Sequence, residues 1–191
     1  MANLQYYSAR ECAFDYRSSV FKYDLFGKGA ITHVTFRLPK KGHYSFNTSY
    51  APLAELADST EDLNAQKISD WVVKIRQSKL PDPEKIGNAG SFFKNPIISK
   101  EFYENLKKSF KTIPAYSISE KLVKIPAAWL IDFCGWKGKR RGDVGCYGKQ
   151  PLVIVNFGQA RASELLAWAD AIRDSIYQQF QIKLEAEVNI L

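Results

Sequence analysis

The sequence predicts an α+β fold, in which a mixed or antiparallel sheet packs against helices. Strand-like and helical segments follow one another without the regular βαβ alternation that builds a parallel sheet. The apolar spacing i, i+3, i+4, i+7 between Ile68 and Ile75 predicts a helix with one buried face. Residues 182–190 carry apolar side chains at the even positions, which predicts a strand with one polar face.

The composition is that of a folded protein that works in a reducing environment. The chain has 191 residues, 46% of them hydrophobic, which suffices for the core of one large or two small domains. Three unevenly spaced cysteines without a CxxC pair predict neither a disulfide framework nor a zinc site, so we expect no metal. Because no signal peptide or membrane span is visible, we expect a cytoplasmic protein without a membrane partner. We also expect a monomer.

The net positive charge favours an anionic partner but does not indicate which kind. A formal charge of +7 suits nucleic acid and suits a phosphorylated or carboxylated small molecule equally well. The densest basic run covers residues 137–141, and such a run is either a solvated loop or a binding site.

The first third of the chain is expected to be strand and loop. Residues 14–38 are predicted to form a β-hairpin with its turn at Gly27-Lys28-Gly29, and Pro39 ends the second strand. Residues 40–59 are polar and predicted to be irregular, with Tyr50 near the end of the loop. A helix is expected to begin after Thr60 as its N-cap and to carry cations, including Lys79, at its C-terminal end.

Residues 79–96 form a segment rich in proline and glycine, which excludes a regular helix or a central strand. Gly87 and Gly90 can adopt positive φ values, and successive backbone N–H groups in such a turn can bind an anion. A hydroxyl, a cation and an amide follow, from Ser91, Lys94 and Asn95. The segment is therefore an anion site, or a structural loop that inserts two phenylalanines into the core.

The second half alternates short helices and strands. We expect a short helix capped by Ser99, an irregular stretch over 113–121, and a short strand over 123–125. A helix from Pro126 through Phe133, a glycine-rich basic segment up to Gln150, and a buried strand over 152–155 should follow. A long helix beginning at Ser163 then precedes the strand over 182–190, whose carboxylates face either a site or solvent.

Residues 87–96, Gly-Asn-Ala-Gly-Ser-Phe-Phe-Lys-Asn-Pro, resemble the corresponding loop of the UDP-N-acetylenolpyruvoylglucosamine reductase family. Further segments agree with that family in order and spacing and lie at 16–22, 79–81, 128–132, 136–138, 150–153 and 184–188. The loop around Tyr50 is similar to that of the first type within the family, in which a tyrosine folds over the substrate. The resemblance covers nearly the whole chain.

The resemblance implies that the chain consists of parts of two domains. Residues 1–59 would be the remnant of the second flavin-binding subdomain, and residues 60–191 would be the substrate-binding domain. The family begins with a flavin-binding half that carries a glycine-serine-rich pyrophosphate loop, and no segment here resembles it. We therefore expect that half as a partner, encoded upstream or supplied in trans.

The resemblance also implies a reaction. In the family, NADPH reduces FAD, and the flavin then reduces the enolpyruvyl group of the substrate, giving UDP-N-acetylmuramic acid for peptidoglycan. Ser91 would protonate the resulting carbanion, while Arg17 and Glu187 would stabilise its charge. Ala186 stands where the family often has proline. The diphosphate and uridine would be held by Tyr50, Lys79, Asn95, Lys137 and Gln150.

Without the flavin half, we expect this chain to bind the UDP-sugar, to retain neither FAD nor NADPH, and not to turn over. The competing interpretation is a basic nucleic-acid-binding module that uses residues 137–141, although the chain has no recognisable nucleic-acid motif. A complete chain that binds UDP-sugars without turnover is the third interpretation.

Overall fold

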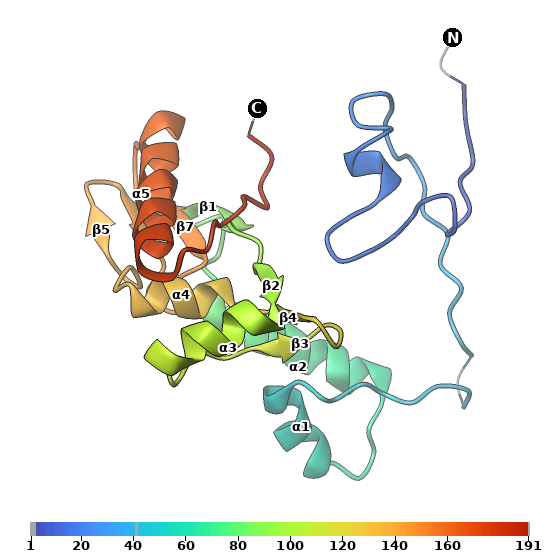
Figure 1. Ribbon diagram of the computed structural model, residues 1–191. Helices are drawn as coiled ribbons and strands as arrows, with labels where there is room; N and C mark the ends of the chain where they lie inside the picture. Colours follow the sequence, from blue (N-terminus) through green and yellow to red (C-terminus); the bar gives the residue numbers. More distant parts are fainter. Residues whose placement is uncertain (1–2, 41, 191) are drawn as a thin grey trace. The chain divides into compact units, whose positions relative to one another are not determined.

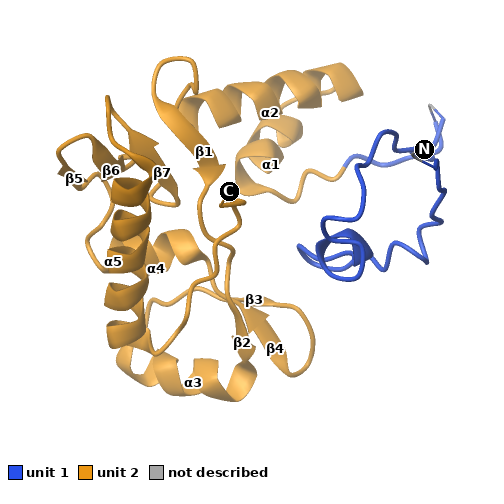
Figure 2. Cartoon of the chain, turned by 90° about the horizontal axis from the view of Figure 1, so that it is seen from above, with its two compact units in different colours: residues 1–46 blue, residues 47–191 orange. Residues whose placement is uncertain are grey.

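The computed structural model describes residues 3–40 and 42–190, and the chain divides into two compact units. Residues 1–46 form the first unit and residues 47–191 the second, as the two colours in Figure 2 show. In the described residues, no helix is both long enough and apolar enough to cross a membrane.

The first unit contains little regular structure. Its one described helix is the 3-10 helix η1 (Val20–Lys22), and Asp15 forms an isolated bridge with Ser18. The predicted hairpin over 14–38 is therefore wrong. The apolar side chains of its second predicted strand are between 60% and 78% exposed: Ile31, Val34, Phe36 and Leu38. Since an isolated hairpin is marginal unless one face is buried, strand-forming composition by itself does not produce the ladder.

The second unit is an α+β domain, which confirms the predicted fold class (Figure 1). Its helices are α1 (Ala51–Asp58), α2 (Ala65–Lys79), α3 (Lys100–Ser109), α4 (Ala127–Phe133) and α5 (Ala162–Phe180). Its strands are β1 (Gly87–Ser91), β2 (Ile97–Ser99), β3 (Tyr116–Ser117), β4 (Leu122–Lys124), β5 (Arg140–Arg141), β6 (Val144–Cys146) and β7 (Val153–Asn156). They build two antiparallel sheets, ordered β1-β7-β6-β5 and β2-β4-β3.

The core lies between α5 and the four-stranded sheet. The long helix contacts β6 and β7, and in Figure 1 it runs along one face of that sheet. Along α5, Ala169, Ile172 and Ile176 are fully buried, as is Val153 in β7. Such burial of a continuous helix stripe is the main source of its stability, which is why the spacing in the sequence predicted this helix well.

The start of the second unit differs from the prediction. Residues 51–58 form helix α1 instead of an irregular loop, because Pro52 is tolerated in the first turn and Leu53 is buried. Thr60 is not the N-cap of α2; its hydroxyl donates to the Leu56 carbonyl at 2.8 Å and closes α1. Asn64 caps α2 instead, since its Oδ1 accepts from the Lys67 N–H at 3.0 Å.

Two further segments also depart from the expectation. The glycine-rich basic segment contains the hairpin β5–β6, which turns at Gly142, where φ is +59°. The predicted last strand is reduced to one bridge between Phe93 and Ala186. The predicted alternation of buried and exposed side chains is present, since Ile182 and Leu184 are buried and Lys183 is exposed. The ladder is short because the chain that follows Phe93 enters β2 of the other sheet.

Candidate functional site

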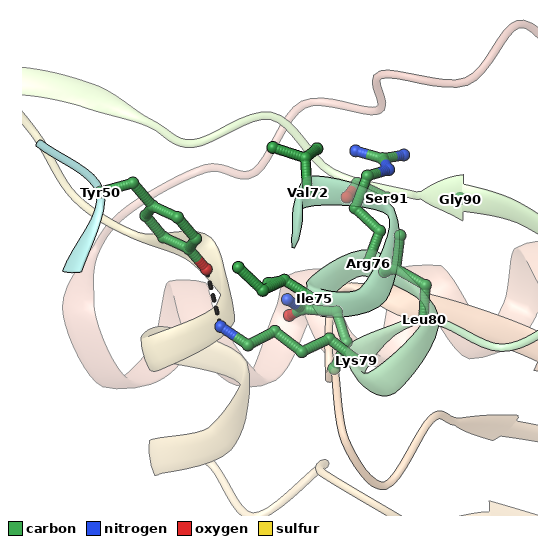
Figure 3. A pocket seen from close by; sticks show the side chains of 9 residues that line it. Tyr50, Val72, Ile75, Arg76, Lys79, Leu80, Gly90 and Ser91 are labelled. Carbon is green, nitrogen blue, oxygen red and sulfur yellow. Dashed lines mark hydrogen bonds between the residues drawn. The ribbon is translucent and has the colours of Figure 1, made fainter. Parts of the chain in front are cut away.

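A cavity of about 390 Å³ lies beside the C-terminal half of α2 (Figure 3). Its nine lining residues are Tyr50, Val72, Ile75, Arg76, Lys79, Leu80, Gly90, Ser91 and Gln150. Four of the eight predicted site residues are among them: Tyr50, Lys79, Ser91 and Gln150. They come from four separate segments of the chain, so the fold gathers them into one site.

Helix α2 supplies one wall of the cavity. Val72, Ile75, Arg76 and Lys79 follow the spacing i, i+3, i+4, i+7 and therefore share a helix face. Val72 and Ile75 are half-buried and give that wall an apolar part, while Arg76 and Lys79 add two cations one turn apart. A wall of this composition suits a ligand with both an apolar surface and negative charge.

Tyr50 is attached to the same wall. The Lys79 Nζ donates to the Tyr50 Oη at 2.7 Å and lies 5.1 Å from the centre of the tyrosine ring (Figure 3). Tyr50 immediately precedes α1 and is 51% exposed. The hydrogen bond and the cation–π contact together hold the aromatic ring against the end of α2.

Ser91 is positioned by an irregularity in the edge strand β1. The pairing of β1 with β7 shifts register between Asn88 and Ser91, and Gly90 has a φ of +74°. The Gly90 N–H donates to the Asn88 side chain at 3.0 Å, which closes the bulge locally. Bulges of this kind redirect a side chain, and only glycine adopts this φ without strain. Gly87 lacks a positive φ and packs against the Asn156 Cβ.

Glu187 forms a backbone hydrogen bond with Phe92, the residue that follows Ser91. The Glu187 N–H donates to the Phe92 carbonyl at 2.8 Å, and the Phe92 N–H donates to the Leu152 carbonyl at the same distance. Lys94 adds an ion pair with Glu185 at 3.0 Å. The C-terminal segment therefore runs antiparallel beside Phe92–Lys94, which brings Glu187 to the Ser91 strand although 95 residues separate them in the sequence.

Two other predicted residues have roles inside the fold. The Asn95 Oδ1 accepts from the Ala127 N–H at 2.9 Å and thereby caps α4, behind a proline that cannot donate. The Lys137 Nζ pairs with the Asp132 carboxylate at 3.1 Å. Neither residue lines the cavity. The eighth residue, Arg17, belongs to the first unit, where its φ is +53°.

Gln150 contributes an unsatisfied acceptor. Its Oε1 is buried and has no hydrogen-bond partner among the described residues. Buried polar atoms are nearly always paired, and leaving one unpaired is costly. A donor group on a bound ligand would satisfy this oxygen.

The basic run packs on the aromatic rings of its own unit. Three cations lie over rings: Lys139 at 4.9 Å from Trp136, Arg140 at 4.2 Å from Phe157, and Arg141 at 5.6 Å from Trp168. Arg140 also pairs with Asp143 at 3.2 Å. These contacts hold the three cations against aromatic rings of the second unit.

The structure therefore defines an α+β domain with a cavity that presents two cations, a serine on a glycine bulge and an unpaired amide oxygen. The sequence model of "UDP-N-acetylenolpyruvoylglucosamine reductase, C-terminal domain" matches residues 82–191. The chain belongs to this family, as its resemblance predicted.

Individual relatives agree with this assignment. The chain is 45% identical over 183 residues to a UDP-N-acetylenolpyruvoylglucosamine reductase of Flavobacterium johnsoniae, covering 95% of this chain and 54% of that protein. It is 40% identical over 185 residues to the reductase of Bacteroides fragilis, covering 97% of this chain and 55% of that protein. It is 45% identical over 184 residues to the reductase of Pseudoalteromonas atlantica, covering 96% of this chain and 52% of that protein. The chain thus spans about half the length of the curated relatives it matches.

Sequence reasoning missed the residues of α2 that line the cavity. The sequence places Val72 and Ile75 in the core stripe and Arg76 among the cations that the helix dipole favours at the C-terminal end, but it predicts none of the three as a site residue. The available signal was helical spacing, since Lys79 was predicted in the site and positions three and four residues earlier share its face.

Proposed function

We propose that this chain is the substrate-binding part of an FAD-dependent, NADPH-using reductase that converts UDP-N-acetylenolpyruvoylglucosamine into UDP-N-acetylmuramic acid. The observation that carries the proposal is the cavity that gathers Tyr50, Lys79, Ser91 and Gln150 in a chain of this family. The reaction belongs to peptidoglycan synthesis in the cytoplasm, and so to cell-wall biogenesis, cell shape and cell division.

The cationic and amide groups bind the nucleotide. Lys79 and Gln150 hold the ligand within the cavity, where Gln150 accepts a hydrogen bond through its unpaired Oε1. Asn95 and Lys137, which do not line the cavity, contact the diphosphate and uridine parts of the ligand that extend beyond it. Tyr50 covers the bound ligand, and the Tyr50–Lys79 hydrogen bond opens when a phosphate oxygen takes its place on the ammonium group.

Ser91 donates the proton that completes the reduction. A serine hydroxyl is a weak acid in water, so its neighbours must orient it and keep the site dry. The Gly90 bulge fixes the backbone that carries this hydroxyl. Arg17 and Glu187 stabilise the negative charge that develops on the substrate carboxyl group. The backbone link from Glu187 to Phe92 keeps the glutamate close to Ser91.

The described residues of this chain do not fit a flavin diphosphate. The described residues of the first unit contain one helix, the three-residue η1, and no strand–glycine turn–helix unit of the kind that binds a dinucleotide diphosphate. We assign residues 1–59 to a flavin-binding domain completed by another segment, which would supply the hydride, and residues 60–191 to the substrate domain. The isolated chain then binds UDP-sugar without turnover.

Isothermal titration of this chain with UDP-N-acetylmuramic acid tests the proposal. We expect saturable binding to the unaltered chain and weaker binding to Lys79→Gln. The purified chain should also lack a flavin absorption band. Absence of heat at millimolar ligand, or a yellow protein with bound flavin, would contradict the corresponding part of the proposal.

A further inference from the structure

Asn88 lies in strand β1 ahead of Ser91, and its side chain does not line the cavity. We propose that Asn88 is a positioning residue, which holds the bulge in β1 and thereby keeps the Ser91 hydroxyl on the cavity side of the sheet. This inference rests on the function proposed above, since it concerns the proton donor of that reaction. The step is a proton transfer: the Ser91 O–H bond breaks, a C–H bond forms on the substrate carbanion, and the serine alkoxide takes a proton back from water.

The register of β1 determines the face from which Ser91 projects. Asn88 is paired with Val155 of β7. Ser91, three residues later, is paired with Val153, which is only two residues away from that partner. One extra residue of β1 therefore lies between the two pairs, as in a β-bulge. Paired residues project from one face, and so do residues two apart in a strand. Asn88 and Ser91 thus share a face, whereas residues three apart in a regular strand project from opposite faces.

Loss of the bulge would turn Ser91 away from the cavity. A shift of one residue in register moves every following side chain to the other face of the sheet. That other face carries Ile154, which belongs to the same core cluster as Ile172 of α5. The Phe92 N–H donates to the Leu152 carbonyl at 2.8 Å, so the shifted register continues past Ser91. The bulge therefore decides whether this hydroxyl reaches the cavity or the core.

The Asn88 side chain bonds to the backbone on both sides of its own position. Its Oδ1 accepts from the Gly90 N–H at 3.0 Å, and its Nδ2 donates to the Ile86 carbonyl at 2.8 Å. The extra residue of a bulge has no partner in the ladder, so the carboxamide supplies one for the Gly90 amide. Asparagine suits this position because its side chain reaches the backbone N–H two residues further on.

The competing explanation is that Asn88 only stabilises the sheet, and Asn156 provides the matched control for it. Asn156 is the last residue of β7 and is half-buried like Asn88. Its Oδ1 accepts from the Gly158 N–H at 3.0 Å, and its Nδ2 donates to the Ala160 carbonyl at 2.9 Å. It lies outside the bulge and does not line the cavity. A purely structural role predicts that removing either carboxamide lowers stability and that neither removal changes turnover selectively.

The variants Asn88→Ala, Asn88→Asp and Asn156→Ala separate the two explanations. Each is made in the flavin-containing reductase, with Ser91→Ala as the reference for loss of the proton donor. Steady-state kinetics give the turnover number and KM for UDP-N-acetylenolpyruvoylglucosamine, and urea denaturation gives the free energy of unfolding. Stopped-flow spectroscopy measures flavin reduction by NADPH separately from flavin reoxidation by the substrate.

We expect Asn88→Ala to lower the turnover number by about 10- to 100-fold with little change in KM, because a small misplacement of a reacting group costs that much. Only flavin reoxidation by the substrate should slow, since reduction by NADPH does not use Ser91. Asn88→Asp keeps an acceptor for the Gly90 N–H and should recover most of the turnover. Asn156→Ala should change turnover by less than about twofold, because it removes no interaction made in the transition state.

Hydrogen exchange measured by NMR on this chain reports the bulge without any catalysis. Exchange of the Gly90 amide should be faster in Asn88→Ala than in the unaltered chain or in Asn88→Asp, because this variant alone lacks the acceptor. Equal exchange in all three would refute the proposed link between Asn88 and the bulge.

The kinetic outcomes also distinguish this inference from the proposed function. If Ser91→Ala slows turnover and Asn88→Ala does not, the role of Asn88 is refuted while the proposed function stands. The same holds if Asn156→Ala slows turnover as much as Asn88→Ala, or if Asn88→Asp is as slow as Asn88→Ala. If the unaltered reductase does not reduce the enolpyruvyl substrate, or Ser91→Ala is fully active, the proposed function fails and the role of Asn88 fails with it.

Discussion

At the scale of single residues, the site depends on backbone geometry as much as on the chemistry of its side chains. Ser91 is an ordinary hydroxyl whose usefulness comes from the bulge that carries it, and Gln150 is an ordinary amide whose oxygen the fold leaves unpaired. Substitutions can therefore separate the positioning of a group from its chemistry.

Replacing Ser91 by alanine should remove the proposed proton donor and little else. In the flavin-containing reductase, we expect the turnover number to fall about 100- to 10,000-fold, because positioned proton donors contribute by that factor. Affinity for UDP-N-acetylmuramic acid should change by less than about tenfold, since one neutral hydrogen bond contributes little. Steady-state kinetics and titration measure the two quantities. Unchanged turnover would exclude Ser91 as the donor.

Replacing Gly90 by alanine should disturb the bulge. A side chain at a φ of +74° costs about 1–2 kcal/mol, so the free energy of unfolding measured in urea should fall by that amount. Ligand affinity should fall as well, because Ser91 would shift. Gly148→Ala is the control, since Gly148 lacks a positive φ and no atom approaches its Cβ position. Equal stability of the two variants would contradict this account of the bulge.

The cysteines allow a prediction about pH. Burial raises the pKa of the Cys146 and Cys134 thiols, because desolvation disfavours the thiolate. Folding therefore favours the protonated thiol, and the resulting stabilisation is complete below the unfolded pKa and is lost as the pH rises above it. Alkylation by iodoacetamide at pH 8 should be slower in the folded chain than in urea, and the difference should be larger for Cys146, which is more buried. Equal alkylation rates in the folded chain and in urea would contradict the burial of these thiols.

At the scale of elements, the segments that the sequence predicted well are those whose apolar spacing matches a buried face. Helix α5 presents a continuous buried stripe, and Ser99 caps α3 as expected through a bond from the Phe102 N–H at 3.1 Å. The hairpin over 14–38 and the strand over 182–190 failed because ladders depend on a partner segment, which composition does not reveal. Helix α1 was missed because its proline and the polar residues before it suggested a loop.

For the site, too, the sequence predicted local features better than contacts between distant segments. The positive φ of Gly90 and the place of Lys79 beside the glycine segment could be predicted from local residue types together with the family resemblance. The strand β1 that carries the bulge was not predicted, because the sequence indicated a loop there. The convergence of Tyr50 and Gln150 with these groups depends on the packing of segments 100 residues apart, and the capping role of Asn95 depends on where α4 begins.

Helix α4 offers a test of the two roles of Asn95. Asn95→Ala removes the acceptor for the Ala127 N–H and should lower the free energy of unfolding by about 0.5–2 kcal/mol, as for other lost helix caps. Asn95→Asp keeps that acceptor and should retain the stability while it weakens uridine diphosphate binding, since it loses the amide donor and adds a negative charge. Urea denaturation and calorimetry measure the two effects. If Asn95→Asp binds the nucleotide normally, Asn95 has only the structural role.

At the scale of the whole molecule, the second unit has a buried core and a lined cavity, whereas the described part of the first unit exposes strand-like apolar side chains such as Phe36 and Leu38. The relatives are about twice as long as this chain. These facts agree with a chain that contributes the substrate site of a reductase whose flavin is held by other residues.

The central claim is that the cavity beside α2 is the site for the UDP-sugar. The most direct measurement is a two-dimensional amide NMR titration of this chain with UDP-N-acetylmuramic acid. The account predicts that the largest chemical-shift changes fall on the amides of Tyr50, Lys79, Gly90, Ser91 and Gln150. Changes that concentrate on residues 137–141, or spectra that do not change at saturating ligand, would contradict it.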